Sequence, residues 1–461
     1  MYGLAIAGAA TVRALRRRDV DVIVADDVDD DARRQLAEAL GVELVAAPDD
    51  AAVDALVSGC DLVVPAPGVP EDHGVITSAR AHRRSLVSEI ELAYDWERER
   101  LGGPRRMLAV TGTDGKTTTT MLAVEMLRAA GVRAVAAGNT DVPLVEALEL
   151  DVDVFVVECA SFRLAWTEHF RGDAAVWLNL APDHLNWHRS MASYEAAKAR
   201  IFELQRTDDV AIGFADDATV MRHLAEAPGR RCTFASLGAD YHRDGDELVG
   251  PHGVLASVHD LRRALPHDVT NSLAAAALVT ETGLADAAAV RSALRSFVGP
   301  RHRIELVGEA DGVRWFNDSK ATTPHASSVA IRAFGSVVLI AGGLNKGLDL
   351  APMGAQSARV RAVVAIGRDA PDISKTFGGA AGLDGPIEVV VADSMRDAVD
   401  LARRAALPGD TVLLSPGCAS FDWYPDGGYP ARGDDFRDEV RRLLDTPMPD
   451  HITTLERGGC R

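Results

Sequence analysis

The sequence has few cysteines and no long apolar run. Its five cysteines are scattered along 461 residues without a C-x-x-C pair, which argues against a disulfide framework and against a cysteine zinc site. Apolar runs such as 337–341 are much shorter than the roughly 20 residues of a membrane-spanning helix. The amino terminus lacks a basic stretch followed by an apolar one, so nothing in it indicates export. We therefore expect a cytoplasmic protein without a membrane span.

The chain also lacks an excess of basic residues. It has 49 Lys and Arg against 68 Asp and Glu, a net charge of −19. Repulsion from a phosphate backbone therefore disfavours a nucleic-acid partner. A small polyphosphate remains compatible with this charge, because local backbone N–H groups, a lysine and a divalent cation outweigh distant acidic residues.

Short β-branched runs alternate with Ala-rich and Arg-rich helical patterns, which predicts βαβ units. Continuous apolar segments at 154–157 and 174–178 indicate strands buried on both faces, hence parallel sheets covered by helices. The expected fold class is α/β. Segments rich in breakers at 98–106 and 299–300 divide the chain into three predicted domains. These domains comprise residues 1–100, 101–299 and 300–461.

The most informative segment, 107–120, has the pattern of a strand, a glycine loop and a helix. Gly112 and Gly115 would let the backbone approach phosphates, Lys116 would supply positive charge, and the Thr117 hydroxyl suits Mg²⁺. Val110 stands where the common G-x-x-x-x-G-K-[ST] pattern has its first glycine. The pattern alone therefore also allows a glycine turn with a solvated lysine, although the flanking strand and helix favour a phosphate loop.

Other polar residues follow predicted strands or begin predicted helices. Glu158 ends a buried strand, where position alone allows either a Mg²⁺ ligand or a helix cap. His184 and His188 have the spacing of a zinc pair, but no second cluster supplies a third ligand, and we reject zinc. Lys198 lies in a helical pattern, where a solvated charge is the default. Asn271 opens an Ala-rich helix and could simply cap it.

The first segment resembles a dinucleotide-binding fingerprint with one glycine missing. Gly3 and Gly8 precede a predicted helix, and Asp26 follows about 20 residues on, but Ala5 stands where a glycine would let pyrophosphate approach. A dinucleotide-dependent oxidoreductase is therefore the alternative from a different class. The glycine loop begins at residue 3, so we expect that the true start and the first strand lie upstream of Met1.

Three loops of the last segment carry groups suited to a dicarboxylate. Thr322, Lys346 and Ser420 lie in loops associated with strands of one inferred sheet. A cationic lysine and two hydroxyls at one sheet edge suit two carboxylates, and ordinary loop polarity is the alternative.

Several segments together resemble the Mur ligase superfamily, the ATP-dependent amide ligases of peptidoglycan and folate metabolism. The segments that carry this resemblance are SEIEL at 88–92, TGTDGKT at 111–117, GN at 138–139, ECASF at 158–162, NLAPDHL at 179–185, YEAAK at 194–198, NDSKAT at 317–322 and LSPGCASFD at 414–422. The resemblance extends from residue 3 to about residue 443. Asp114 stands where asparagine is common in this family.

The resemblance implies three α/β domains. These are a Rossmann-like N-terminal domain for a UDP-linked substrate, a central P-loop-type domain for ATP, and a Rossmann-like C-terminal domain for an amino acid. The last two segments are most similar to the branch that joins D-glutamate to UDP-N-acetylmuramoyl-L-alanine through an acyl phosphate. Another Mur-type or folylpolyglutamate-type ligase is the nearest alternative. The expected enzyme is a monomer that uses ATP and two Mg²⁺ ions, with a hinge at Gly299-Pro300.

The resemblance also assigns roles to individual residues. ATP would be bound by Gly112, Thr113, Asp114, Gly115, Lys116, Thr117, Thr118, Asn271, Arg303 and Asp318. Magnesium would be bound by Thr117, Glu158, His184 and a carbamylated Lys198, a modification that needs a neutral amine with a pKa lowered by burial. The expected catalytic residues are Lys116, His184 and Lys198. The two substrates would be bound by Ile6, Ala7 and Asp26 on the UDP side, by Asn139, and by Thr322, Lys346, Ser420 and Tyr429 on the glutamate side.

Overall fold

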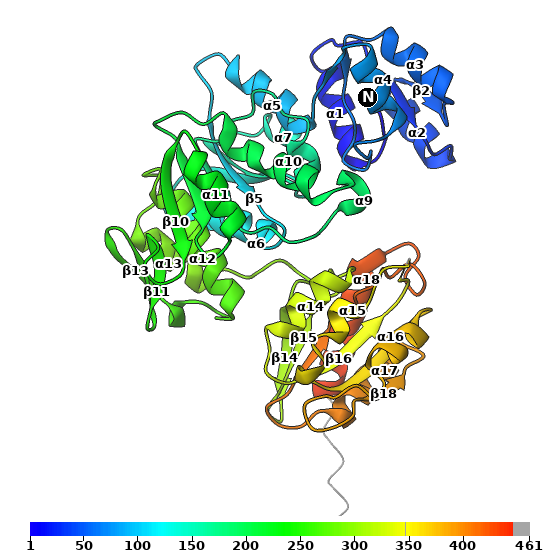
Figure 1. Ribbon diagram of the computed structural model, residues 1–461, viewed down its shortest axis with the longest axis vertical. Coiled ribbons are helices and arrows are strands. Elements are labelled where there is room, and N and C mark those ends of the chain that lie inside the picture. The colour runs from blue at the N-terminus through cyan, green and yellow to red at the C-terminus, as the bar shows by residue number, and fades with distance from the viewer. Residues whose placement is uncertain (346, 446–461) are drawn as a thin grey trace, which may run out of the picture. The chain divides into compact units, whose positions relative to one another are not determined.

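The computed structural model describes residues 1–345 and 347–445, and it divides into two compact units (Figure 1). The first unit is Met1–Val298 and the second begins at Gly299. Both are built from helices and predominantly parallel sheets, so the predicted α/β class is confirmed. The further division of residues 1–298 at residue 100 stays a prediction. Within the described residues, none of the helices is both long enough and apolar enough to cross a membrane.

The first unit begins with two small parallel strand pairs, β1 with β2 and β3 with β4. Their bounds are β1 Ile23–Asp26, β2 Glu43–Ala46, β3 Leu62–Val63 and β4 Ser85–Leu86, and the helices between them are α1 Ile6–Arg16, α2 Asp31–Leu40, α3 Asp50–Ser58 and α4 Gly74–Ala81. Tyr2 forms parallel bridges to both Ala25 and Pro65, so its backbone lies between the two pairs. Tyr2 therefore lies immediately before the glycine-containing segment that begins at Gly3, where a dinucleotide-binding fingerprint has a strand. The expected upstream strand stays a prediction.

A nine-stranded sheet forms the centre of the first unit, in the order β13-β12-β11-β10-β9-β8-β5-β7-β6. The strands are β5 Arg106–Thr111, β6 Ala134–Gly138, β7 Val154–Glu158, β8 Ala174–Trp177, β9 Val210–Phe214, β10 Arg230–Ala235, β11 Tyr241–Asp244, β12 Glu247–Gly250 and β13 Gly253–Ser257. Neighbours from β6 to β11 are parallel, and β11, β12 and β13 are antiparallel. The apolar runs at 154–157 and 174–177 are fully buried strands, as predicted.

Helices cover both faces of this sheet. They are α5 Glu89–Arg98, α6 Lys116–Ala129, α7 Leu144–Ala147, α8 Ser161–Leu164, α9 Leu185–His188, α10 Met191–Glu203, α11 Ala218–Glu226, α12 Pro266–Thr280 and α13 Ala287–Ser296, with a 3₁₀ turn at Val258–Asp260. Alternate residues of β5 enter different cores: Leu108 and Val110 join the cluster with α6, α12 and α13, whereas Met107 and Ala109 join the cluster with α5, α7 and α10. The continuous apolar pattern of β5 follows from this two-sided burial.

The second unit has a six-stranded sheet in the order β14-β15-β19-β16-β17-β18. Its strands are β14 Glu305–Ala310, β15 Val313–Asn317, β16 Val337–Gly342, β17 Val360–Ile366, β18 Glu388–Val391 and β19 Thr411–Leu414. Its helices are α14 Pro324–Arg332, α15 Ala351–Gly354, α16 Ala370–Phe377, α17 Met395–Ala405 and α18 Gly428–Asp445, with a 3₁₀ turn at Ser357–Arg359. Only the edge strand β14 pairs in the antiparallel sense among these described strands. Trp315, Ile340 and Phe436 lie in the buried core.

Candidate active site

The glycine loop lies between the carboxyl end of β5 and the start of α6. Gly115 adopts a left-handed conformation with φ 86°, and a Cβ at this position would lie 2.5 Å from the Asn271 Oδ1 atom. Glycine is therefore required here for both backbone and steric reasons. The first N–H groups of a helix have no carbonyl one turn earlier, so the start of α6 presents donors and a positive helix end. This is the strand, loop and helix that the sequence predicts.

Two lysines converge on one carbonyl of this loop. Lys116 Nζ donates to the carbonyls of Gly112 and Thr113 at 2.8 Å each, and Lys198 Nζ donates to the Gly112 carbonyl at 2.6 Å. Lys198 is only 1% exposed, so it is not the solvated charge that its helical position suggests. Burial lowers the pKa of Lys198 well below its usual value, and the nearby Lys116 charge lowers it further. The site therefore combines positive charge with a lysine that loses its proton readily.

Glu158 lies beside this loop with one carboxylate oxygen unused. The register pairs Glu158 with Val110 in the neighbouring strand β5, and the side chain is buried. Its Oε1 accepts a hydrogen bond from Asn139 Nδ2 at 3.1 Å. Its Oε2 has no hydrogen-bond partner among the described residues. A buried carboxylate oxygen left without a partner at the edge of a parallel sheet fits a cation ligand such as Mg²⁺.

The loop after β8 carries the two histidines. His184 has a left-handed backbone with φ 52°, and burial together with Lys116 and Lys198 lowers the pKa of its ring, partly offset by Asp183. A neutral imidazole can bind a metal ion. His188 is fully buried, and its Nε2 lies 2.8 Å from Ser161 Oγ. His188 therefore packs against the start of α8 as a supporting residue.

The structure places several other predicted ATP ligands around the loop. Thr117 and Thr118 lie in the first turn of α6 and are half-buried, as is Asp114. Asn271 lies on α12 with its Oδ1 against Gly115 and 3.4 Å from Thr119 Oγ1. This position makes Asn271 a support for the loop, and its contact with a nucleotide base stays a prediction.

Sequence reasoning missed two residues that hold the glycine loop. Tyr194 is fully buried and its hydroxyl lies 3.0 Å from Thr113 Oγ1. Asn179, two residues after β8, accepts hydrogen bonds from the N–H groups of Thr113 and Asp114. Both residues lie in segments that carry the family resemblance. The only signal for Asn179 in the residue pattern was its position just past the end of a predicted strand.

Of the residues predicted to bind the UDP-linked substrate, Ile6, Ala7 and Asp26 lie in the first segment of the chain, whereas Asn139 follows β6 and contacts Glu158. Asp26 is buried, and its carboxylate accepts hydrogen bonds from the N–H groups of Leu4 at 2.6 Å and Val28 at 2.9 Å, and contacts Arg33 Nε at 3.0 Å. These contacts hold the N-terminal glycine-containing segment, which begins at Gly3, and they occupy the whole carboxylate of Asp26. Ile6 is 81% exposed at the start of α1. Residues that line a small pocket beside it include Ala7, Thr11, Ala66, Ser88 and Arg163.

The second unit holds the remaining predicted residues, except that Lys346 lies outside the described residues. Arg303 is half-buried, and its Nε has no hydrogen-bond partner among the described residues. Asp318 is buried and accepts hydrogen bonds from the Ile304 N–H at 3.1 Å and from Ser415 Oγ at 2.8 Å. Thr322 is half-buried in the loop that precedes α14.

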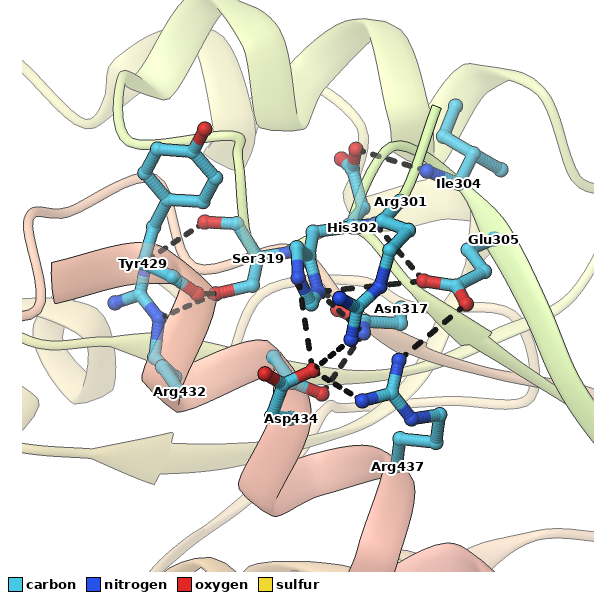
Figure 2. A network of polar contacts seen from close by, with 12 residues as sticks. Arg301, His302, Ile304, Glu305, Asn317, Ser319, Tyr429, Arg432, Asp434 and Arg437 are labelled. Atoms are coloured by element: carbon cyan, nitrogen blue, oxygen red, sulfur yellow. Dashed lines mark hydrogen bonds and ion pairs between the residues drawn. The ribbon is translucent and has the colours of Figure 1, made fainter. Parts of the chain in front are cut away.

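A buried arginine joins the loops that are predicted to bind glutamate. Arg432 is 1% exposed and donates to the Ser319 carbonyl at 2.9 Å and to the Cys418 carbonyl at 3.1 Å, as Figure 2 shows in part. Ser420 is buried two residues farther on. The backbone carbonyl of Tyr429 accepts a hydrogen bond from Ser319 Oγ at 2.8 Å. The loops after β15 and β19 are therefore held side by side on α18.

A second set of contacts in Figure 2 fixes the segment that enters this unit. His302 has a left-handed backbone with φ 60°, and its Nδ1 lies 3.1 Å from Asn317 Nδ2. Its Nε2 lies 3.7 Å from Asp434, which also binds Arg301 at 2.5 Å. The ring packs directly over Gly433, where a Cβ would lie 2.2 Å from Nδ1. Arg303, next to His302, is thus on a segment anchored to α18.

Comparison with known proteins matches both units. Residues 110–279 match the "Mur ligase middle domain" and residues 302–418 match the "Mur ligase, glutamate ligase domain". A UDP-N-acetylmuramoylalanine--D-glutamate ligase from Frankia casuarinae is 43% identical over 96% of this chain and 93% of its own length. A ligase of the same name from Streptomyces coelicolor is 38% identical over 96% of this chain and 97% of its own.

Solved structures show the same fold. The MurF ligase from Thermotoga maritima, solved in complex with ADP, superimposes with a TM-score of 0.57 at 16% sequence identity, covering 84% of this chain and 99% of that one. At this identity the likeness concerns the fold alone. The curated relatives are far more similar in sequence, and they match nearly the whole chain. The chain therefore belongs to the Mur ligase family.

Proposed function

We propose that this chain is an ATP-dependent ligase that joins D-glutamate to UDP-N-acetylmuramoyl-L-alanine in peptidoglycan precursor synthesis. The observation that carries this proposal is the convergence of Lys116 and Lys198 on Gly112, beside the unpartnered buried oxygen of Glu158. Such a site suits a triphosphate with its divalent cation. The choice of substrates rests on the names of the relatives that match nearly the whole chain.

The residues around the loop fit ATP and magnesium. The N–H groups at the start of α6 and the Lys116 ammonium would hold the phosphates, and Asn271 would contact the nucleotide. Thr117, Glu158 and His184 would hold two Mg²⁺ ions. Magnesium, when bound, would neutralise charge on the phosphate oxygens.

Lys198 suits a covalent role. Its lowered pKa favours the neutral amine, which can attack CO₂. A carbon–nitrogen bond forms as one C=O π bond of CO₂ breaks and its electron pair moves to oxygen. The nitrogen loses one proton to water, and the product is a carbamate with a negative charge. A carbamate at Lys198 would turn a buried cation into a carboxylate-like Mg²⁺ ligand, next to the loop that binds phosphate.

The proposed reaction has two steps. A substrate carboxylate attacks the γ-phosphorus, the bond to ADP breaks, and an acyl phosphate forms while Lys116 and Arg303 neutralise the transferring charge. The neutral amine of D-glutamate then attacks the acyl carbon, and inorganic phosphate leaves as the amide forms. Asp318 would contact the ribose of ATP.

The remaining residues would hold the two substrates. On the UDP side these are Ile6, Ala7 and Asp26, and on the glutamate side Thr322, Lys346, Ser420 and Tyr429. Asn139, beside Glu158, would also contact substrate. The oxidoreductase alternative is not favoured, because the carboxylate of Asp26 already accepts two backbone N–H groups and contacts Arg33. We further propose that the enzyme works as a monomer in the cytoplasm, where ATP is available.

The test is phosphate release from ATP in the presence of UDP-N-acetylmuramoyl-L-alanine and one amino acid at a time. We expect release with D-glutamate and none with L-glutamate, lysine or diaminopimelate. Lys116→Ala should abolish the release. Release with lysine or diaminopimelate would reassign the acceptor, and full activity of Lys116→Ala would contradict the role of the loop.

A further inference from the structure

We infer that Asn179 is a positioning residue that sets the shape of the phosphate loop and decides which of its N–H groups can bind ATP. Asn179 follows β8 by two residues and does not belong to the lysine and carboxylate set described above. The inference rests on the proposed function, because it assumes that ATP binds at this loop.

The side chain of Asn179 is bonded to two consecutive backbone units of the loop. Its Oδ1 accepts the N–H groups of Thr113 at 2.9 Å and of Asp114 at 2.8 Å. Its Nδ2 donates to the Asp114 carbonyl at 3.2 Å. The Asn179 main-chain carbonyl also lies 3.1 Å from the Thr113 nitrogen. One carboxamide therefore satisfies a short stretch of loop backbone as a neighbouring strand would.

These hydrogen bonds remove two donors from the set that phosphates could use. Gly112 is already packed tightly, since a Cβ there would lie 2.9 Å from the Leu178 Cβ. Because the N–H groups of Thr113 and Asp114 are engaged by Asn179, the predicted ATP contacts of these two residues would not use their N–H groups, and the phosphates would be bound by N–H groups later in the sequence, at the start of α6. Asn179 thereby selects the helix end as the phosphate site.

The same contacts join the phosphate loop to the loop that carries His184. Thr113 Oγ1 accepts the Ala181 N–H at 2.9 Å and lies 3.1 Å from the Ala181 carbonyl. Asn179 and Ala181 are part of one segment that leads to His184. A shift of the Asn179 carboxamide would therefore move the phosphate-binding N–H groups and the proposed metal ligand His184 together. A distant core residue would not couple these two groups.

The experiment compares Asn179→Ala with a matched control, Asn186→Ala, which alters an exposed asparagine of the same region. Two dissociation constants are measured by calorimetry, for ATP with Mg²⁺ and for UDP-N-acetylmuramoyl-L-alanine. We expect Asn179→Ala to weaken ATP binding about tenfold or more, because hydrogen bonds that shape the donor set are lost. Binding of the UDP substrate should stay within about twofold of the parent, since Asn179 has no hydrogen bond to Ile6, Ala7, Asp26 or Asn139 among the described residues. The control should leave both constants unchanged.

The variant Asn179→Ser serves as the second test if Asn179→Ala does not fold. A serine keeps a neutral polar side chain but is too short to accept both N–H groups and to donate to the Asp114 carbonyl, so the selective loss of ATP affinity should remain. ATP binding within threefold of the parent, or an equal loss for both ligands, would overturn the inference. A parent chain that binds no ATP would instead contradict the proposed function, so the two failures are distinguishable.

Discussion

Lys198 shows how far the surroundings of a residue decide its chemistry. In the sequence it is one lysine in a helical pattern, and the general expectation for such a lysine is a solvated charge. In the fold the side chain is 1% exposed, and its ammonium reaches the carbonyl of Gly112. Burial of this amine disfavours its charged form, and a second lysine on the same carbonyl adds to that effect. The charged form of this amine is therefore disfavoured at its position, and the proposed covalent role of Lys198 would use the neutral form.

A single substitution of Lys198 should therefore have opposite effects on stability and on activity. Lys198→Met replaces the buried amine by an apolar side chain of similar length, so it should leave the melting temperature unchanged or raise it by about 2 °C or more in CO₂-depleted buffer. Phosphate release should fall at least about 100-fold. Lys375→Met, at an exposed lysine in the second unit, is the control and should change neither quantity. A drop of several degrees for Lys198→Met would show that the lysine is structural.

The unpartnered carboxylate oxygen of Glu158 leads to a prediction: its substitution should impair the use of Mg²⁺ by the enzyme without unfolding the protein. Glu158→Gln keeps an oxygen that can accept the hydrogen bond from Asn139, but it removes the negative charge from the unpartnered position. We expect phosphate release to fall at least about 100-fold and added Mg²⁺ not to restore it.

The measurement for Glu158→Gln is a Mg²⁺ titration of phosphate release, together with a melting curve. The melting temperature should stay at or above that of the parent, because the substitution removes a buried charge. Glu226→Gln, at an exposed carboxylate of α11, is the control. Normal activity of Glu158→Gln at the usual Mg²⁺ concentration would exclude Glu158 as a metal ligand.

The close approach of α18 to residue 302 gives a further prediction. Gly433→Ala would place a methyl group 2.2 Å from the His302 ring and so displace the ring from Asn317. We expect a loss of about 1–3 kcal/mol in the free energy of unfolding, although alanine is otherwise favoured over glycine within a helix. Chemical denaturation of the full chain measures this loss.

A double-mutant cycle tests the cause of that loss. His302→Asn removes the ring, and asparagine tolerates the left-handed backbone that residue 302 adopts. The double variant Gly433→Ala with His302→Asn should therefore lose less stability than the two single losses added together. If Gly433→Ala is as stable as the parent, or if the two losses simply add, the steric explanation is wrong.

The elements themselves were largely predictable from the sequence, whereas the contacts between them were not. The strand at 154–158 and the strand, loop and helix at 107–129 follow from local patterns, because buried parallel strands read as continuous apolar runs. The packing of Asn271 against Gly115, by contrast, joins residues more than 150 positions apart. No local pattern carries that information, so Asn271 was predicted as a helix cap or a base contact and its support of the loop was missed.

Among the described residues, each of these hydrophobic clusters belongs to one unit. The clusters of the first unit contain residues up to Phe297, and the cluster around Trp315 contains residues from Val307 onward. Each unit is also larger than about 100 residues, a size at which a single core supports independent folding. The residues predicted to bind ATP and Mg²⁺ are distributed over both units in the sequence, because the glycine loop, Glu158 and Lys198 belong to the first unit and Arg303 and Asp318 to the second.

This division predicts that residues 1–298, expressed alone, fold and bind ATP with Mg²⁺ more weakly than the full chain. The fragment retains the start of α6 and both converging lysines, so binding should persist, while the absence of Arg303 and Asp318 should cost about tenfold or more in affinity. Calorimetry and a melting curve measure both properties, and Lys116→Ala in the same fragment is the control that should remove the binding. Amide formation should be absent, since the residues proposed to bind glutamate belong to 299–461. A fragment that folds but binds no ATP would mean that the first unit is not sufficient to hold the nucleotide, and that the proposed contacts of Arg303 and Asp318 dominate over the glycine loop.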